Sequence, residues 1–519
     1  MISTTAPDRL RSASNLWASF RFGSRRIAGL VAAFLAFHLA DAAEPWFQIH
    51  VVDEQTGRGV PLVELETVNN VVHVTDSAGR VAFLEPGLMN RRVFFSVRSH
   101  GYEMRKDGFG MAGTALDVKP GGSATIKLKR LNVAERLYRV TGGGIYHDSV
   151  LLGEPVPLRE PVLNGSILGQ DSVQVVKYRG KLYWFWGDTN IPRYPLGNFC
   201  TTGATSELPQ NGGLDPAQGV NLTYFTDDKG KPAPMCPDFG EGVVWIDGLL
   251  TINDSTGRER LVTRYMRLKG LGHPLEHGLA VWNDDQARFE KLMQFDLTRE
   301  WRAPQGHPIR LSDGGLEYIV SPAPWPVTRV RANWASLTNQ AAYEAFTCVQ
   351  GGKVQRDSQG APQWRWTNDA EPLTQKAERK LVESGQLKSD EARFQWVDAE
   401  TGKPVELHAG SIHWNEFRQR WILIGVQQGG TSYLGEIWYA EANSPTGPWR
   451  KARKVVTHEK YSFYNPTQHP HFDQQGGRLI YFEGTYTHTF SGNPRQTPRY
   501  DYNQVMYRLD LADPRLRVE

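Results

Sequence analysis

A short unit that recurs five times along residues 170–482 limits what this chain can fold into more than any other feature. Each copy begins with a polar residue, continues as a short apolar strand, turns, and returns as a second strand rich in aromatic or aliphatic residues. The copies cover residues 170–188, 241–248, 307–320, 408–426 and 468–482. Such antiparallel units cannot bury both faces alone, so repeats of this size stack around an axis and share a core. The repeat predicts an all-β fold with a five-bladed β-propeller at residues 145–512.

Two segments between the repeats break the strand pattern. Residues 371–387 place apolar side chains such as Leu373 and Leu381 at helical spacing among charged residues, which predicts a short amphipathic helix. Residues 336–346 are a second helical candidate. We expect one or two short helical insertions, which either wall the centre of the propeller or decorate its surface.

Before the repeats, residues 44–131 alternate apolar and polar residues in short runs separated by turns, as half-buried strands do. Two stretches of this region stand out, VVDEQTGRGVPLVEL at 51–65 and TDSAGR at 75–80. They resemble the carboxypeptidase-regulatory-like, prealbumin-type β-sandwich. The resemblance implies a small accessory sandwich that acts as a spacer or packing module, and a module with its own ligand site is the alternative.

Residues 1–42 have the pattern of a signal peptide. Arg25 and Arg26 precede a 14-residue apolar run at 27–40, and Ala-Asp-Ala at 40–42 fits the small-x-small cleavage rule. The run is too short to span a bilayer. We therefore expect a periplasmic or secreted protein with no integral membrane segment after cleavage, and an uncleaved anchor is the alternative.

The cysteine content fits the same compartment. The chain has three cysteines, Cys200, Cys236 and Cys348. In an oxidising environment Cys200 and Cys236, which both lie in turn-rich segments, are candidates for a disulfide that leaves Cys348 free.

Charge and motifs exclude several classes of function. Lys and Arg number 59 against 56 Asp and Glu, and the excess of three lies within residues 1–42. Because the rest of the chain is neutral, we expect no nucleic-acid partner. The chain has no G-x-S-x-G, H-E-x-x-H or P-loop pattern. We predict no cofactor and assign no metal ligand.

The starts of the five repeats hold the candidate functional residues. The first strand of each propeller blade begins near the axis, so these starts converge. Their residues are polar: Asp171, Glu241, His307, His408 and His469. They line either a hydrated channel or a polar sugar site with aromatic stacking platforms. Three aromatic residues are candidate platforms, with packing between blades as their other possible role: Trp186, Trp245 and Tyr486.

Two stretches carry a second family resemblance. Residues 171–188 combine an Asp at the strand start, an apolar strand, an R-G-K turn and an aromatic strand, and residues 444–449 spell SPTGPW. Both patterns resemble the five-bladed propeller glycoside hydrolases, the group that contains arabinanases, β-xylosidases, levansucrase-like enzymes and neoagarobiose hydrolases. The R-D-P that is usual at the first blade is absent, and Gln170-Asp171-Ser172 stands in its place.

The resemblance implies a carbohydrate substrate and assigns roles to carboxyl groups. Glycoside hydrolysis needs one protonated and one ionised carboxyl on opposite sides of the bond. Asp171 is the expected base, Glu241 the first choice for the acid, and Glu436 its competitor. Some members use histidine, so His307 or His469 could replace both acids. Members mostly invert, which predicts that the Asp171 and Glu241 carboxyls stand about 6.5–9.5 Å apart.

The sequence thus leads to three hypotheses. The first is an exported glycoside hydrolase that cleaves a polysaccharide or oligosaccharide. The second is a carbohydrate-binding propeller without catalysis, which the missing R-D-P motivates. The third is a polysaccharide lyase that uses a Tyr or His base beside Arg310 or Arg331.

Overall fold

The computed structural model describes residues 45–193, 200–322, 324 and 328–517, and residues 46–519 form one compact unit. The predicted signal peptide, 1–42, lies outside the described residues. The described part contains three α-helices, α1 (His147–Leu151), α2 (Trp334–Leu337) and α3 (Gln375–Glu383), and is otherwise mostly β, as predicted. None of these helices has the length and apolar content needed to cross a membrane.

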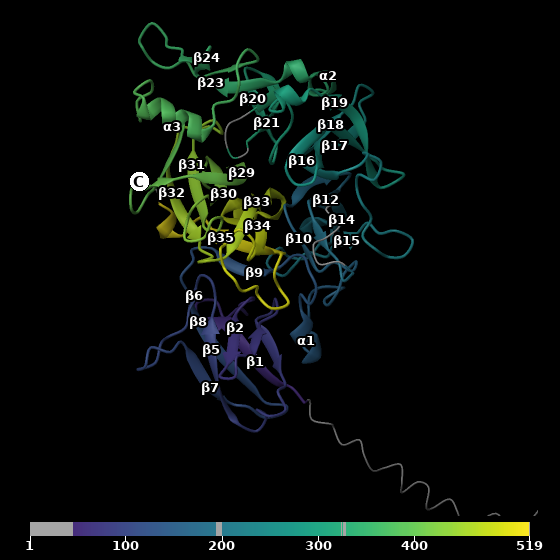
Figure 1. Ribbon diagram of the computed structural model, residues 1–519, viewed down its shortest axis with the longest axis vertical. Helices are drawn as coiled ribbons and strands as arrows, with labels where there is room; N and C mark the ends of the chain where they lie inside the picture. Colours follow the sequence, from purple (N-terminus) through teal and green to yellow (C-terminus); the bar gives the residue numbers. More distant parts are fainter. Residues whose placement is uncertain (1–44, 194–199, 323, 325–327, 518–519) are drawn as a thin grey trace, which may run out of the picture. The chain divides into compact units, whose positions relative to one another are not determined.

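The N-terminal strands form two four-stranded sheets, in the orders β4-β1-β8-β6 and β3-β2-β5-β7 (Figure 1). Their bounds are β1 Phe47–Asp53, β2 Glu64–Thr67, β3 Val72–Val74, β4 Arg80–Phe83, β5 Arg92–Arg98, β6 Tyr102–Glu103, β7 Gly113–Asp117 and β8 Ser123–Arg130. Alternate residues of β5 are buried, as expected for a strand with one face on a core. Ile49 and Val51 from the first sheet and Leu65 and Phe95 from the second belong to one hydrophobic cluster. The two sheets therefore share one core.

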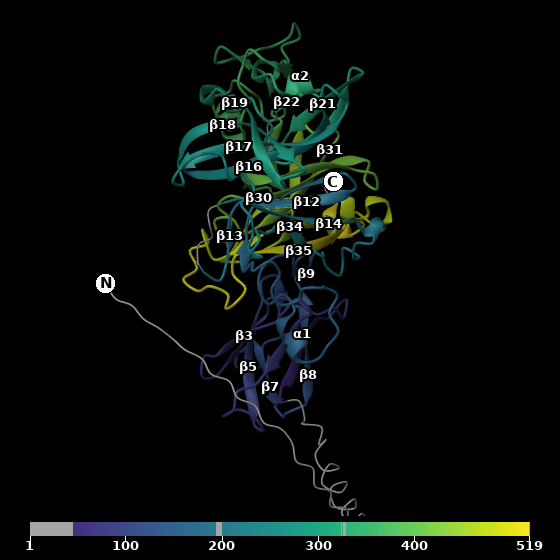
Figure 2. The same ribbon diagram turned by 90° about the vertical axis from the view of Figure 1, so that its right-hand side faces the viewer.

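Five further sheets, here called sheets I to V, follow in chain order, and all their strand pairs are antiparallel except one in sheet IV (Figures 1 and 2). Sheet I contains β11 Gln174–Tyr178, β12 Lys181–Trp186, β14 Thr202–Glu207 and β15 Thr223–Tyr224. Sheet II contains β16 Val243–Asn253, β17 Glu259–Lys269, β18 His273–Asn283 and β19 Arg288–Phe295. Sheet III contains β20 Ile309–Asp313, β21 Leu316–Ser321, β22 Thr328–Arg331, β23 Glu344–Thr347 and β26 Arg365–Thr367.

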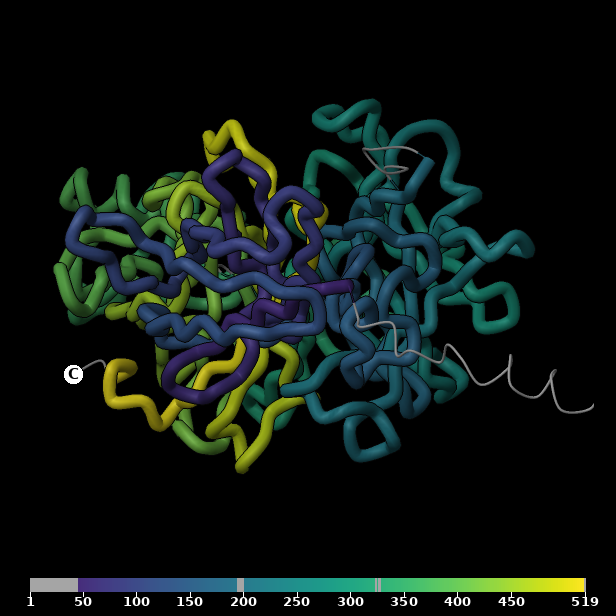
Figure 3. The backbone as a smooth tube through the Cα atoms, turned by 90° about the horizontal axis from the view of Figure 1, so that it is seen from below, coloured from purple at the N-terminus to yellow at the C-terminus, as the bar shows by residue number. Residues whose placement is uncertain are grey.

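The last two sheets complete the series. Sheet IV contains β27 Phe394–Asp398, β28 Pro404–Val405, β29 Leu407–Asn415, β30 Arg420–Gln427, β31 Ile437–Ala442 and β32 Trp449–Val456. Sheet V contains β33 Ser462–Gln468, β34 Leu479–Thr487, β35 Asn503–Asp510 and β9 Glu135–Arg139. Two strand pairs stand outside them, β10 (Gly169–Gln170) with β13 (Thr189–Asn190), and β24 (Val349–Gln350) with β25 (Lys353–Val354). In the backbone trace, sheets I and II (blue to teal) and sheet IV (green) occupy opposite sides of the view (Figure 3).

Strand β9 joins the two ends of this series. β35 pairs with β9, which precedes sheet I in the chain. Every residue of β9 is buried. Its pairing covers an edge of β35 that would otherwise present unpaired backbone groups.

The helical insertions match the sequence in part. α3 lies inside the predicted range 371–387, and its N-cap Thr374 accepts a hydrogen bond from the backbone N–H of Ala377. The range 336–346 instead divides into the end of α2, a 3₁₀ turn (Gln340–Ala342) and the start of β23. The short helix α1 was not predicted.

One strand of each of the five sheets meets the others around one cavity. Residues of β11, β16, β20, β29 and β33 line this space, which has a volume of about 360 Å³. Of the five polar residues that the sequence singled out, His307 and His469 line it.

Candidate functional site

The hairpin of β11 and β12 brings two aspartates together. The strands are antiparallel, with Gln174 opposite Phe185, so the residues before β11 and after β12 are neighbours. The Asp188 backbone N–H donates to Asp171 Oδ1 at 2.9 Å. Gly187 precedes Asp188, and a Cβ there would stand 3.1 Å from Asp171 Oδ1. Glycine therefore leaves space for the Asp171 carboxylate. Local hairpin geometry thus builds the Asp171–Asp188 pair.

Sheet V holds Asp171 from its other side. The Tyr464 hydroxyl donates to Asp171 Oδ2 at 2.7 Å. Next to it, Ser172 donates its N–H to Thr485 Oγ1 at 3.1 Å, and its hydroxyl accepts from Asn465 Nδ2 at 2.8 Å. Burial raises the pKa of Asp171, while the hydrogen bonds from Tyr464 and from the Asp188 N–H favour its charged form.

Sheet II holds Asp188. Trp245 of β16 donates its indole N–H to Asp188 Oδ1 at 3.0 Å. Burial, and after it the negative charge of Asp171, raise the pKa of Asp188 to about 6. The two carboxyls therefore point toward different sheets, Asp171 toward Tyr464 of sheet V and Asp188 toward Trp245 of sheet II.

A third carboxyl stands beside this pair. Asp247 lies two residues after Trp245 in β16, so the two side chains share a face of the strand. Gln174 Nε2 of β11 donates to Asp247 Oδ1 at 3.4 Å, and 41% of the Asp247 side chain is exposed. Burial of the carboxyl group raises the pKa of Asp247, and the positive charge of Arg264, 4.0 Å away, opposes this rise. We call Asp171, Asp188 and Asp247 the carboxyl cluster.

The carboxyl cluster has the chemistry of proton transfer. Environments that push the pKa values of neighbouring acids apart separate a group that holds a proton from one that accepts it. Burial raises the pKa of both acids, that of Asp188 to about 6, and the hydrogen bonds from Tyr464 and from the Asp188 N–H act against the rise at Asp171. The pair therefore offers two adjacent carboxyls with raised pKa values for proton transfer.

Glu241 does not belong to the cluster. It is exposed, precedes β16, and uses its backbone carbonyl to accept from Arg267 Nη1 at 2.9 Å. Two residues of β16 bond to Gln174 of β11, Asp247 through its side chain and Leu249 through its backbone N–H. The sequence thus named the start of the second repeat correctly as a strand start, but not the residue that reaches the first strand of sheet I.

Glu436 is buried in the loop between β30 and β31. It is 1% exposed, and its Oε1 accepts from the backbone N–H of Thr431 at 3.1 Å and from the hydroxyl of the same residue. A Cβ at Gly430 would lie 1.7 Å from Glu436 Oε2, so any other residue there would displace the carboxylate. These contacts give Glu436 a role in holding its loop.

The three predicted histidines lie in different places. His307 and His469 line the cavity between the five sheets. His469 Nε2 also donates to Glu483 Oε1 at 3.0 Å. His408 is exposed at the second position of β29.

The predicted aromatic platforms also separate. Trp186 is buried and stacked on Trp184, and Tyr486 is buried and stacked on Tyr461. Both serve packing, the alternative that the sequence left open. Trp245 is half-buried and is the one of the three that contacts the carboxyl cluster.

Sequence reasoning missed Asp188, Asp247 and Tyr464. The hairpin was the signal for Asp188, because the residues flanking two paired strands must be neighbours. Asp247 lies within the second repeat, but no pattern in the sequence marks its hydrogen bond with Gln174 of β11. No local pattern marks Tyr464, which reaches Asp171 from 293 positions away.

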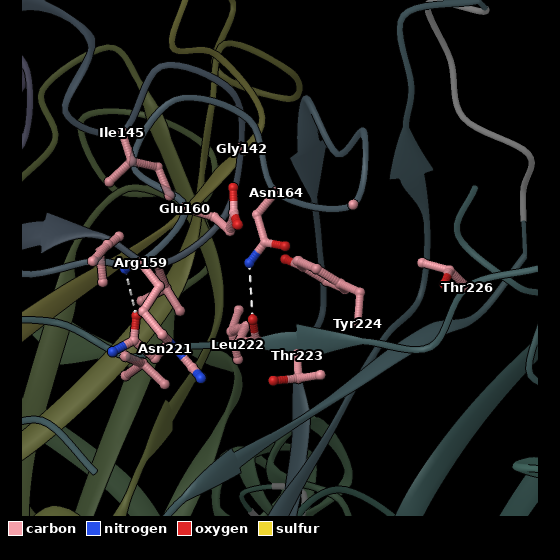
Figure 4. Close-up of a pocket in the computed structure, with 14 residues that line it drawn as sticks. Gly142, Ile145, Arg159, Glu160, Asn164, Asn221, Leu222, Thr223, Tyr224 and Thr226 are labelled. Atoms are coloured by element: carbon pink, nitrogen blue, oxygen red, sulfur yellow. Dashed lines mark hydrogen bonds between the residues drawn. The ribbon is translucent and has the colours of Figure 1, made fainter. Parts of the chain in front are cut away.

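Another pocket, of about 390 Å³, lies beside β15 (Figure 4). Asn164 Nδ2 donates to the Leu222 carbonyl at 2.9 Å, and the Arg159 N–H donates to Asn221 Oδ1 at 2.9 Å. Glu160 is the only carboxyl among its lining residues. This pocket lacks the second acid that acid–base chemistry requires.

The cysteines are free in the structure. Met235 donates its N–H to the Thr201 carbonyl at 2.8 Å, which places Cys200 opposite Cys236. Burial, and after it the nearby charge of Asp188, raise the pKa of Cys200 to about 11. The cysteine pair therefore stands beside the carboxyl cluster.

Comparisons with known proteins add the following. No family model matches the chain, and no curated protein matches it. An exo-β-1,3-galactanase from Phanerochaete chrysosporium is 11% identical, with a TM-score of 0.38, 69% of this chain covered and 66% of that chain, just under two thirds of its length. A thermostable family-43 glycoside hydrolase is 12% identical, with a TM-score of 0.31 and coverage of 66% of this chain and 88% of that one. A GH43_1 enzyme from Xanthomonas citri, complexed with xylotriose, is 10% identical, with a TM-score of 0.32 and coverage of 66% and 87%. Likenesses this low identify neither the fold nor the activity of this chain.

Proposed function

We propose that this protein is an exported glycoside hydrolase whose sheets I to V are the blades of a five-bladed propeller and whose N-terminal sheets form an accessory prealbumin-type β-sandwich. The observation that carries the activity is the Asp171–Asp188 pair, two adjacent carboxyls held by different sheets with the pKa of Asp188 raised to about 6. One strand from each of sheets I to V lines the same cavity, and this convergence supports the propeller.

Asp188 is the acid and Asp171 the base. Protonated Asp188 gives its proton to the glycosidic oxygen as the bond from that oxygen to the anomeric carbon breaks. Asp171 accepts a proton from a water molecule, whose oxygen forms the new bond to the anomeric carbon. The products are two shorter sugars, and a proton returns from Asp171 to Asp188 through solvent.

Tyr464 and Trp245 position the two acids. The Tyr464 hydroxyl fixes Asp171 Oδ2 and stabilises its charge, which suits a base. The Trp245 indole fixes Asp188 Oδ1, and its half-buried ring offers an apolar face beside the acid. Asp247 shares that face of β16 and is the competing candidate for the acid.

The function is tested on a panel of plant and algal polysaccharides and oligosaccharides. New reducing ends that depend on Asp171 support the proposal. Ends with the absorbance of an unsaturated uronate would identify a lyase, and binding without new ends would identify a carbohydrate-binding propeller.

The roles are tested with Asp171→Asn, Asp188→Asn and Asp247→Asn. Asp227→Asn is the matched control, because Asp227 is an exposed turn residue that keeps its backbone hydrogen bonds as Asn. We expect the first two variants to lose most turnover and the control to keep it. If Asp247→Asn loses turnover while Asp188→Asn keeps it, the acid is Asp247.

A further inference from the structure

The cavity between the five sheets is separate from the carboxyl cluster. Asp171 and Asp188 flank the open ends of β11 and β12, before and after the strands. The cavity is instead lined by Val175 and Val176 within β11 and by the last residues of β29 and β33 with the turn that follows. The proposed hydrolysis uses none of its polar side chains.

Four histidines line this cavity: His307, His413, His469 and His471. Burial, and then the proximity of other imidazoles, lower the pKa of His307 to about 4 and that of His413 to about 3. The pKa of His471 is lowered for the same reasons. These three rings are neutral at pH 7, and a neutral ring offers one hydrogen-bond donor and one acceptor.

Two buried polar atoms of the lining have no hydrogen-bond partner among the described residues, His413 Nε2 and Gln468 Oε1. Gln468 is 3% exposed, and its amide nitrogen donates to the Asp473 carboxylate at 3.2 and 3.3 Å. Its oxygen is therefore an acceptor that is still available. Leaving a buried polar atom unpaired is unfavourable, so a ligand that pairs with both atoms is favoured.

An indole surface borders these atoms. Trp414 is 39% exposed, lines the cavity, and meets Trp421 edge-on at a ring distance of 5.9 Å. Aromatic faces beside convergent hydrogen-bonding groups favour a ring that is apolar on one face and hydroxylated at its rim.

We propose that this cavity binds one neutral sugar unit, which pairs its hydroxyls with His413 and Gln468 and packs a face against Trp414. Its volume of about 360 Å³ lies within the range of about 300–1,000 Å³ typical of small-molecule sites. The one cationic side chain of the lining, Arg310, already donates to the Thr251 carbonyl at 2.8 Å, which disfavours an anion. Among the described residues, no three His, Cys, Asp or Glu side chains are placed to share a metal ion. The inference does not rest on the proposed hydrolysis, because it needs no member of the carboxyl cluster.

Calorimetric titration of the full chain with D-galactose, D-xylose, L-arabinose and D-glucose tests the site. We expect at least one sugar to bind and Trp414→Ala to weaken it at least tenfold. Phe417→Ala is the matched control, since Phe417 is an exposed aromatic on the same hairpin and does not line the cavity. Asp171→Asn must also leave the affinity unchanged. Absence of binding by all four sugars, equal effects of the two aromatic variants, or loss of binding in Asp171→Asn would overturn the proposal.

A second measurement tests the neutrality of the ligand. Sugar binding should move the His413 imidazole resonance at pH 7 without proton uptake, so the binding enthalpy should not vary with the ionisation enthalpy of the buffer. Sodium acetate at the same concentration should leave that resonance in place. Proton uptake on sugar binding, or a larger response to acetate than to any sugar, would show that the cavity takes an anion instead.

Discussion

The carboxyl cluster and the histidine-lined cavity both involve β11 and β16, but burial shifts the pKa values of their ionisable groups in opposite directions. Burial raises the pKa of Asp188 to about 6 and lowers the pKa of His413 to about 3. Both shifts favour the neutral form. A neutral carboxyl carries a proton that it can donate to a leaving group, whereas a neutral imidazole at pH 7 carries no excess charge. The same physical cause therefore equips one region for proton transfer and the other for binding hydroxyl groups.

The largest effect should follow from removing the base. Asp171→Asn deletes the ionised group that activates water, so we expect kcat to fall by roughly 10²–10⁴-fold. Circular dichroism should show an unchanged fold, and Asp227→Asn should retain wild-type turnover. A rate above about one tenth of wild type would rule out Asp171 as the base and move the functional site toward the cavity.

A disulfide should stabilise only the region next to the carboxyl cluster. Cys200 and Cys236 lie opposite one another, whereas Cys348 is buried with Leu373 and Leu387. Closing the loop between them should stabilise the fold by about 4 kcal/mol in the chain-entropy model. The measurement is chemical unfolding with and without oxidised glutathione, with Cys348→Ser as the control that keeps the effect and Cys200→Ser as the variant that loses it. Equal midpoints of the oxidised and reduced protein would contradict the pairing.

The shifted pKa of Asp188 predicts a conflict between activity and stability. Its pKa is about 6 in the folded chain, above the ordinary value of 3.8, so between those pH values the folded state binds more protons than the unfolded state. The stability that this group contributes is present below about pH 4 and is lost as the pH rises through 6. Asp188→Asn should therefore stabilise the fold at pH 7 by about 1–3 kcal/mol while it removes turnover. Thermal unfolding at pH 4 and pH 7 checks this, and a destabilised variant at pH 7 would show that Asp188 is ionised at little cost.

The two regions also differ in how far the sequence could predict them. The repeat pattern located β11 and therefore Asp171, and helical spacing located α3. It placed the second acid at Glu241, at the start of the second repeat, whereas the side chain of β16 that bonds to Gln174 of β11 is Asp247. Periodicity marks where a strand begins but not which of its side chains meets the neighbouring sheet. His307 precedes β20, as predicted, but His469 follows the last residue of β33 and is not at a strand start. His413 and Trp414 near the end of β29 escaped because only strand starts were expected near the axis.

The smallest predicted difference concerns the distance between the Asp171 and Asp188 carboxyls. A change of a few ångströms in this distance would alter the stereochemistry of the product. An inverting enzyme needs carboxyls about 6.5–9.5 Å apart to admit a water molecule, and a retaining enzyme needs about 5–5.5 Å. Asp171 and Asp188 are neighbours in the hairpin, but their bonds to Tyr464 and Trp245 direct the carboxyls toward different sheets. We therefore expect inversion, seen by proton NMR as the first anomer formed before mutarotation. Retention would instead make Asp171 a nucleophile and place the two carboxyls closer together.

Trp245→Phe removes the hydrogen bond that holds Asp188 toward sheet II, so it should lower the rate. If the variant forms a mixture of both anomers where the wild type forms one, this hydrogen bond sets the distance between the two carboxyls.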